Sequence, residues 1–172
     1  DYHGINCCGF AISPTEAIAI ESRPDRWKPL EFHKLWDLYR QIWESENIGK
    51  IAQNAMFEMW WASVYGIGFN NITFDTMLGM KFLHPTLERG LDNVGRLYTP
   101  YPYWKDGLGD WANVTGWREH LLYNGRDTTG QFMAKFNMEK ALESRGMDGT
   151  FKNFIMPQVN IAHSMQTRGL RL

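Results

Sequence analysis

The chain lacks several features that would assign it to other classes of protein. Its 172 residues are 44% hydrophobic and 22% charged, which excludes an intrinsically disordered chain. No apolar run approaches the roughly 20 residues needed to span a bilayer. There is no internal repeat, no Gly-x-x-x-x-Gly-Lys-Ser/Thr loop and no Gly-x-Gly-x-x-Gly, so the chemistry of nucleotide-binding loops has no support. We therefore expect one sizeable globular domain with no membrane partner.

A surplus of positive charge is also missing. The net charge is −1, whereas proteins that bind duplex DNA through its phosphates usually carry excess Lys and Arg. The missing positive charge counts against a protein that recognises base sequence in the grooves of duplex DNA. It does not count against a nuclease that holds a strand end through metal cations, because the cations supply the positive charge.

Cysteine is scarce, and the two cysteines are neighbours. Adjacent residues of a strand point to opposite faces, so Cys7 and Cys8 are interpreted as small buried strand residues rather than a disulfide or a shared metal site. Such cysteine usage fits a reducing, cytoplasmic compartment.

Hydrophobic periodicity predicts an α/β domain. Apolar runs at residues 4–13 and 17–20, separated by Ser-Pro-Thr-Glu, predict a β-hairpin. Strands are predicted at 50–53 and 67–73, each followed by a helix. The predicted helices cover residues 30–45, 54–66, 75–83, 90–96, 117–145 and 154–169.

The same periodicity predicts the apolar face of two helices. In the helix that begins at Asn54, one side is expected to carry four large apolar residues: Phe57, Trp60, Trp61 and Val64. In the long helix, the inward stripe is expected to comprise Phe132, Met133 and Phe136.

Three acidic motifs occur in a fixed order along the chain. They are Asn54-x-x-Phe57-Glu58, then Phe74-Asp-Thr-Met-Leu78, then Tyr123-x-x-x-Asp127. Residues four apart lie on the same face of a helix, so Tyr123 and Asp127 are expected to lie one above the other. Carboxylate oxygens are the ligands that Mg²⁺ and Mn²⁺ prefer.

This order of motifs resembles that of DEDD-type 3′–5′ exonucleases, and in particular the proofreading exonuclease domain of family A DNA polymerases from bacteria and phages. The stretch Pro102-Tyr-Trp-Lys-Asp-Gly107 resembles a phage polymerase segment at the same place, and residues 154–172 resemble the helix that joins exonuclease to polymerase. The resemblance implies a ribonuclease-H-like three-layer fold with a mixed five-stranded sheet. Residues 1–150 would be the exonuclease domain, and 151–172 the start of the linker helix.

One part of the family pattern is absent. The first strand of that fold carries an Asp-x-Glu pair, and no such pair occurs in residues 1–13. We therefore expect an exonuclease domain truncated at its N-terminus, without its first strand and half of its metal site, and nearly inactive as a fragment.

The resemblance also implies roles for individual residues. Glu58 and Asp127 would hold two divalent cations, Mg²⁺ or Mn²⁺, and the Tyr123 phenol would orient the attacking water. The family usually has Asp where Glu58 stands, and taken alone Glu58 is interpreted as a solvated helix acid. Phe57 and Lys105 would contact the DNA strand.

Asn54 and Asp75 each have two interpretations. Asn54 either hydrogen-bonds the DNA strand or caps the helix that follows it. Asp75 is interpreted as a helix N-cap rather than as a metal ligand.

The expected function is hydrolysis of phosphodiester bonds at single-stranded DNA 3′ ends during proofreading. The expected partner is a polymerase domain in the same chain, and the expected location is the cytoplasm of a bacterial or phage-infected cell. Two alternatives stay open. One is a stand-alone DEDD nuclease acting on RNA or DNA. The other is an exonuclease-like domain that has lost catalysis and serves as a scaffold, which Glu58 would suggest.

Overall fold

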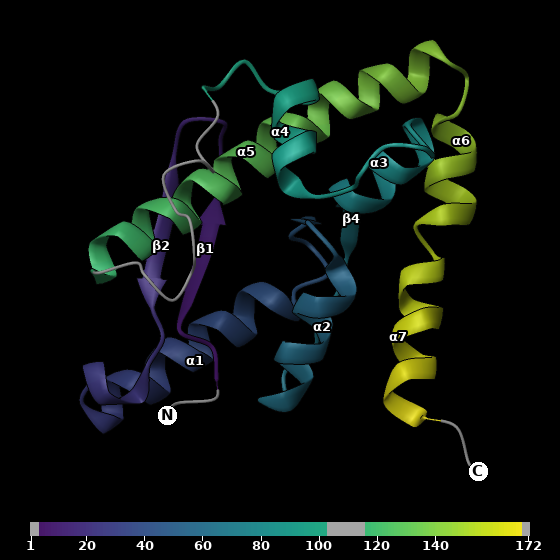
Figure 1. Cartoon of the computed structure of the whole chain (residues 1–172). Helices are drawn as coiled ribbons and strands as arrows, with labels where there is room; N and C mark the ends of the chain where they lie inside the picture. The colour runs from purple at the N-terminus through teal and green to yellow at the C-terminus, as the bar shows by residue number, and fades with distance from the viewer. Residues whose placement is uncertain (1–3, 103–115, 170–172) are drawn as a thin grey trace.

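The computed structural model describes residues 4–102 and 116–169. It is a mixed α/β structure, and its described strands form two separate two-stranded sheets. Figure 1 shows the first sheet on the left, the second near the centre, and the long helix α5 running across the upper part of both. No helix among the described residues is long and apolar enough to cross a membrane.

The first sheet is the predicted β-hairpin. Strand β1 (Cys7–Ala11) pairs antiparallel with β2 (Ala17–Glu21), with Cys7 opposite Glu21. Helix α5 packs against both strands. The contact is close because β1 carries Gly9, where an added Cβ would lie 2.0 Å from the Asn124 side chain of α5.

An aromatic cluster lies beneath the hairpin. A short 3-10 turn, η1 (Pro24–Arg26), leads into helix α1 (Pro29–Trp43), which agrees with the predicted helix. Tyr39 and Trp43 of α1 stack with ring centroids 5.2 Å apart, and Trp36 stacks on Tyr65 at 4.1 Å. Burial of these rings provides the main apolar stabilisation of this half of the molecule.

The second sheet is a parallel pair joined by a helical crossover. Strand β3 (Lys50–Ala52) leads into α2 (Ala55–Val64), and β4 (Ile72–Asp75) returns beside β3. The predicted strand at 67–73 begins too early. Residues 67–71 form a loop whose Asn70 and Asn71 side chains donate to the carbonyl oxygens of Glu44 and Glu46.

Helices α3 (Thr76–Leu83) and α4 (Leu91–Tyr98) follow β4. After the undescribed segment, α5 (Trp117–Ser144) leads through the short α6 (Asp148–Thr150) and the π-turn η3 (Phe151–Ile155) to α7 (Gln158–Arg168). Residues of these elements share one core with β4 and α2. Its fully buried side chains include Phe74, Met80, Val94, Ala134, Met138, Leu142 and Phe151.

The predicted inward stripe of the long helix is wrong. Phe136 is 41% exposed, and the buried stripe of α5 instead consists of Tyr123, Gly130, Ala134, Met138 and Leu142. The small side chain of Ala134 lets the neighbouring elements of the core approach the helix closely. The large aromatic rings lie to one side, where Phe132 and Phe136 contact each other at 5.2 Å.

In helix α2, too, the predicted apolar face is not the buried face. Its buried face carries Ala55, Met59 and Ala62, whereas the large apolar residues predicted to line one side are exposed or half-buried. Small residues again determine where the helix meets the core.

Candidate functional site

The start of α2 is held in place by a carboxylate from the next strand. Asp75, at the end of β4, is only 2% exposed and accepts hydrogen bonds from the backbone N–H groups of Met77 and Leu78. It also accepts from the N–H groups of Asn54 and Ala55, at 3.3 and 2.7 Å. One side chain therefore caps both α2 and α3 and aligns the two positive helix ends with a negative charge. The predicted N-cap role of Asp75 is confirmed.

Asn54 adopts a left-handed conformation with φ 67° at the N-terminus of α2. Asparagine tolerates this region better than most residues. Its side chain makes no capping hydrogen bond, so the capping interpretation is wrong and Asp75 performs that task. The contact of Asn54 with a DNA strand stays a prediction.

Glu58 lies one turn into α2. The residue keeps contact with solvent, yet protein surrounds the carboxyl group closely enough that loss of hydration raises its pKa to about 7. The negative charge of Asp75 is the second cause of the increase.

Asp127 belongs to the inward side of α5. It is partly buried, and it follows Tyr123 by four residues and precedes Gly130 and Ala134 by three and seven. These spacings place all four residues in the same helical stripe. Tyr123, Gly130 and Ala134 are buried, so Asp127 lies among residues that face the interior. The predicted pairing of Tyr123 and Asp127 on one face agrees with this arrangement.

Strand β1 lies between α5 and the aromatic cluster of α1. Burial raises the pKa of the Cys8 thiol to about 12. The next residue, Gly9, lies against Asn124 and Thr128 of α5. Because adjacent residues of a strand face opposite sides of a sheet, Cys8 faces the aromatic cluster and Gly9 faces α5.

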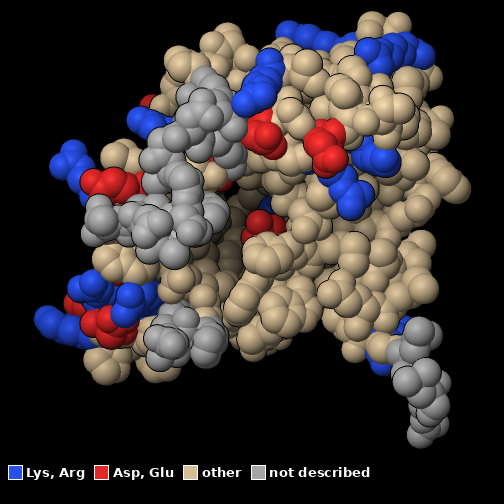
Figure 2. Space-filling view, viewed as in Figure 1, with Lys and Arg blue, Asp and Glu red and all other residues tan. Residues whose placement is uncertain are grey.

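Figure 2 shows a hollow near the centre of this face of the molecule, with an acidic side chain beside it. Phe57, predicted to contact substrate, is 55% exposed on α2 and meets Trp61 edge-on at 6.3 Å. Lys105, the predicted phosphate contact, lies outside the described residues.

The carboxylates of this region are the type of ligand that a hard cation prefers, but among the described residues there are too few of them to complete a coordination shell. Glu58 and Asp127 offer carboxylate oxygens, whereas both oxygens of Asp75 are already engaged by backbone N–H groups. Within residues 4–102 and 116–169, no three His, Cys, Asp or Glu side chains are grouped so as to hold a metal ion. Cations at this place would need further ligands besides Glu58 and Asp127.

Sequence reasoning missed two features of this region. The capping of α2 by Asp75 was not predicted, because the two lie 20 residues apart and no local pattern links them. The approach of Cys8 to Glu58 was also missed, because it depends on how the hairpin packs against α2.

Comparison with known proteins adds no family assignment. No protein-family model matches the chain, and no curated protein matches it at a significant level.

Proposed function

We propose that the chain is the 3′–5′ exonuclease domain of a DNA polymerase of family A, which hydrolyses phosphodiester bonds at single-stranded 3′ ends. The observation that carries the proposal is the order of the three acidic motifs along the chain. Glu58 lies one turn into α2, and Tyr123 and Asp127 lie four residues apart on one face of α5.

The proposed roles follow from the chemistry of the side chains. Two divalent cations, when bound, would lower the pKa of the attacking water and offset the charge that builds on the phosphate. Glu58 and Asp127 would hold them. The Tyr123 hydroxyl would orient the water, and the exposed ring of Phe57 would stack on a base near the strand end. Asn54, at the positive end of α2, would donate a hydrogen bond to the DNA.

The arrangement of the strands supports a ribonuclease-H-like sheet. Helix α5 packs against β1, β2 and β3, so the two small sheets share one covering helix. Each two-stranded sheet has outer strand edges that are unpaired among the described residues. We propose that a further strand pairs with both edges and joins the two sheets into one. This strand would carry the Asp-x-Glu pair that completes the set of carboxylates.

A nuclease assay on the protein as its gene encodes it tests the proposal. The substrate is 5′-labelled single-stranded DNA in the presence of Mg²⁺ or Mn²⁺. We expect stepwise shortening from the 3′ end that is abolished by a chelator. Asp127→Asn should reduce the rate by about a hundredfold or more, because a lost carboxylate ligand weakens cation binding. The matched control is Asp37→Asn on the exposed face of α1, which should leave the rate unchanged.

Two results would contradict the assignment. One is digestion that starts at the 5′ end or within the strand. The other is full activity in the Asp127→Asn protein. Degradation of RNA in preference to DNA would favour a stand-alone nuclease of the same class.

A second candidate is a scaffold that has lost catalysis, and one observation favours it. The pKa of Glu58 is raised to about 7, so this carboxyl is partly protonated near neutral pH and is a weaker cation ligand than an ordinary aspartate. If that candidate holds, neither cation will support hydrolysis at any pH, while the unmodified protein still folds. Glu58→Asp, which restores the residue usual in the family, would then be the variant to test for regained activity.

A further inference from the structure

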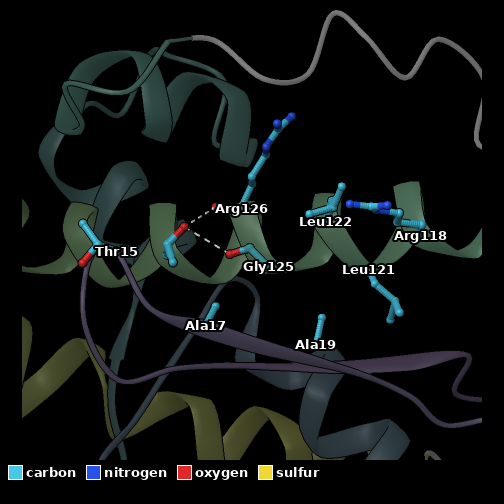
Figure 3. Close-up of a pocket in the computed structure, with 9 residues that line it drawn as sticks. Thr15, Ala17, Ala19, Arg118, Leu121, Leu122, Gly125 and Arg126 are labelled. Atoms are coloured by element: carbon cyan, nitrogen blue, oxygen red, sulfur yellow. Dashed lines mark hydrogen bonds between the residues drawn. The ribbon is translucent and has the colours of Figure 1, made fainter.

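A groove lies on the flank of α5 opposite to the stripe that contains Asp127. We call it the β2–α5 groove. Its walls are Ala17 and Ala19 of β2 on one side and Leu121 and Leu122 of α5 on the other, with Arg118 and Arg126 at the helix side. Figure 3 shows Leu121 directed toward β2, with Ala17 and Ala19 below the helix. The groove encloses about 570 Å³, enough for several side chains of a bound segment.

The strand that borders the groove has a free edge. Among the described residues, β2 pairs only with β1. The backbone bonds from Ser22 N–H to Asn6 and from Ile12 N–H to Glu16 show which residues of β2 face β1. Because orientation alternates along a strand, the even-numbered residues Ile18 and Ile20 bond to β1. The N–H and C=O groups of Ala17 and Ala19 therefore point away from the hairpin, along the groove.

The described residues give this edge none of the usual protection against pairing with another chain. Natural edge strands are commonly interrupted by proline, lysine or an inward-pointing charge. Strand β2 reads Ala-Ile-Ala-Ile-Glu, and Ile18 is 65% exposed. Its first four residues thus present an apolar strand with two donors and two acceptors open to a partner.

The groove also has a defined charge. Arg118 and Arg126 are exposed, and neither guanidinium group has a hydrogen-bonding or ion-pair partner among the residues that the structure describes. None of the described residues that line the groove is acidic. Eight residues of helix separate the two arginines by about 12 Å along the axis. Four residues of extended chain span about 13 Å, so acidic side chains four positions apart would match both arginines.

We propose that the β2–α5 groove binds an extended segment of a partner protein that adds as a third strand to β2. The segment carries acidic side chains four positions apart, which pair with Arg118 and Arg126. Its backbone bonds to Ala17 and Ala19, and its small apolar side chains contact Leu121 and Leu122. A nucleic-acid strand fits less well, because the lining includes no aromatic ring for base stacking and a phosphate backbone would leave the carbonyl acceptors of β2 without donors.

Binding of a designed peptide tests the proposal. The probe is a fluorescent ten-residue peptide of valine and threonine, blocked at both ends, with two glutamates four positions apart. The matched control has the same composition with the glutamates three positions apart, and hence on opposite faces of an extended chain. We expect the probe to bind at least about tenfold more tightly than the control. Hydrogen exchange of the Ala17 and Ala19 amides should slow when the probe is bound.

Two sets of variants separate charge from strand pairing. Arg118→Glu with Arg126→Glu should weaken binding of the acidic probe by at least about tenfold, and should favour a peptide with lysines in place of the glutamates. Both positions are exposed, so the fold should not change. Ala19→Pro removes an outward-pointing donor, whereas Ala19→Ser keeps it, so only the proline variant should lose affinity.

Several results would overturn the proposal. They are the absence of binding up to about 1 mM probe, equal affinity for the probe and the control peptide, or binding that survives reversal of both arginines. A ten-residue oligothymidylate that binds through the same arginines, without slowing amide exchange in β2, would assign the groove to nucleic acid instead.

Discussion

The two small sheets of the molecule are built in different ways. The β1–β2 hairpin is a local antiparallel unit, and its core is a cluster of aromatic rings that also holds a hydrogen bond between the hydroxyl groups of Tyr39 and Ser22, at 2.8 Å. The β3–β4 pair is parallel, requires α2 as a crossover, and shares a core of aliphatic, methionine and phenylalanine side chains. Helix α2, which carries Glu58, contributes Ala62 to the first core and Ala55 and Met59 to the second.

The contrast between the two cores indicates how stability is distributed around the candidate site. The β3–β4 half depends on contacts between residues distant in sequence, including Phe151 from the turn before α7. The hairpin half depends on rings within α1 and its neighbours. Mutations in the two halves should therefore lower the free energy of unfolding by different amounts. The stability of the contact between the halves should depend on pH.

The largest effect is expected in the β3–β4 half. Phe151 is fully buried and contacts Phe74 with ring centroids 5.0 Å apart. Phe151→Ala should lower the free energy of unfolding by about 3–5 kcal/mol, because it removes buried apolar surface and leaves a cavity. Chemical denaturation measures the change. Phe154→Ala, at a residue 64% exposed, is the control and should cost less than about 1 kcal/mol. Equal losses in the two variants would show that the core is not centred on Phe151.

A smaller effect is expected in the hairpin half. Tyr39→Phe removes a buried hydrogen bond to Ser22, whose hydroxyl still donates to the Ile20 carbonyl. The loss should be about 1 kcal/mol. The double variant, Tyr39→Phe with Ser22→Ala, should lose less free energy of unfolding than the sum of the two single variants, because neither hydroxyl group is then left without its partner. Strict additivity in this double-mutant cycle would mean that the two hydroxyl groups do not interact.

The smallest effect is expected between the halves, at Glu58. Its pKa is raised from 4.5 to about 7, so the folded protein binds a proton that the unfolded chain releases. Stability should therefore fall as pH rises from about 4.5 to about 7, and solvent contact should keep this effect modest. In a chelating buffer, thermal denaturation across this range should show a steeper decline for the unmodified protein than for Glu58→Gln. Parallel curves would mean that Glu58 titrates normally.

The sequence predicted most of the helices because their signals are local. Pro29 begins α1, Gly146 follows α5, and the apolar spacing within α3 is helical. The start of β4 could not be predicted, because Ile67 is buried within a loop that asparagine side chains hold in place. Hydrophobic periodicity favours large residues, so it also missed the role of Gly130 and Ala134 as the contact surface of α5.

The candidate site was predictable only in part. Glu58 and Asp127 could be singled out from motif order, but the surroundings that raise the pKa of Glu58 depend on tertiary contacts, such as the one between Asp75 and the start of α2. The β2–α5 groove had no sequence signal at all. Its walls come from alanines and leucines whose significance emerges only when a strand edge and a helix flank lie side by side.

The double cap formed by Asp75 has a practical consequence for mutational scans. Its carboxylate fixes the first turn of α2, and that turn carries Asn54, Phe57 and Glu58. Replacing Asp75 would loosen all three at once, so a screen that scores only activity would rank it among the catalytic acids. Measuring the helicity of α2 and the folding of the variant beside its activity would show that Asp75 acts by holding α2 in place.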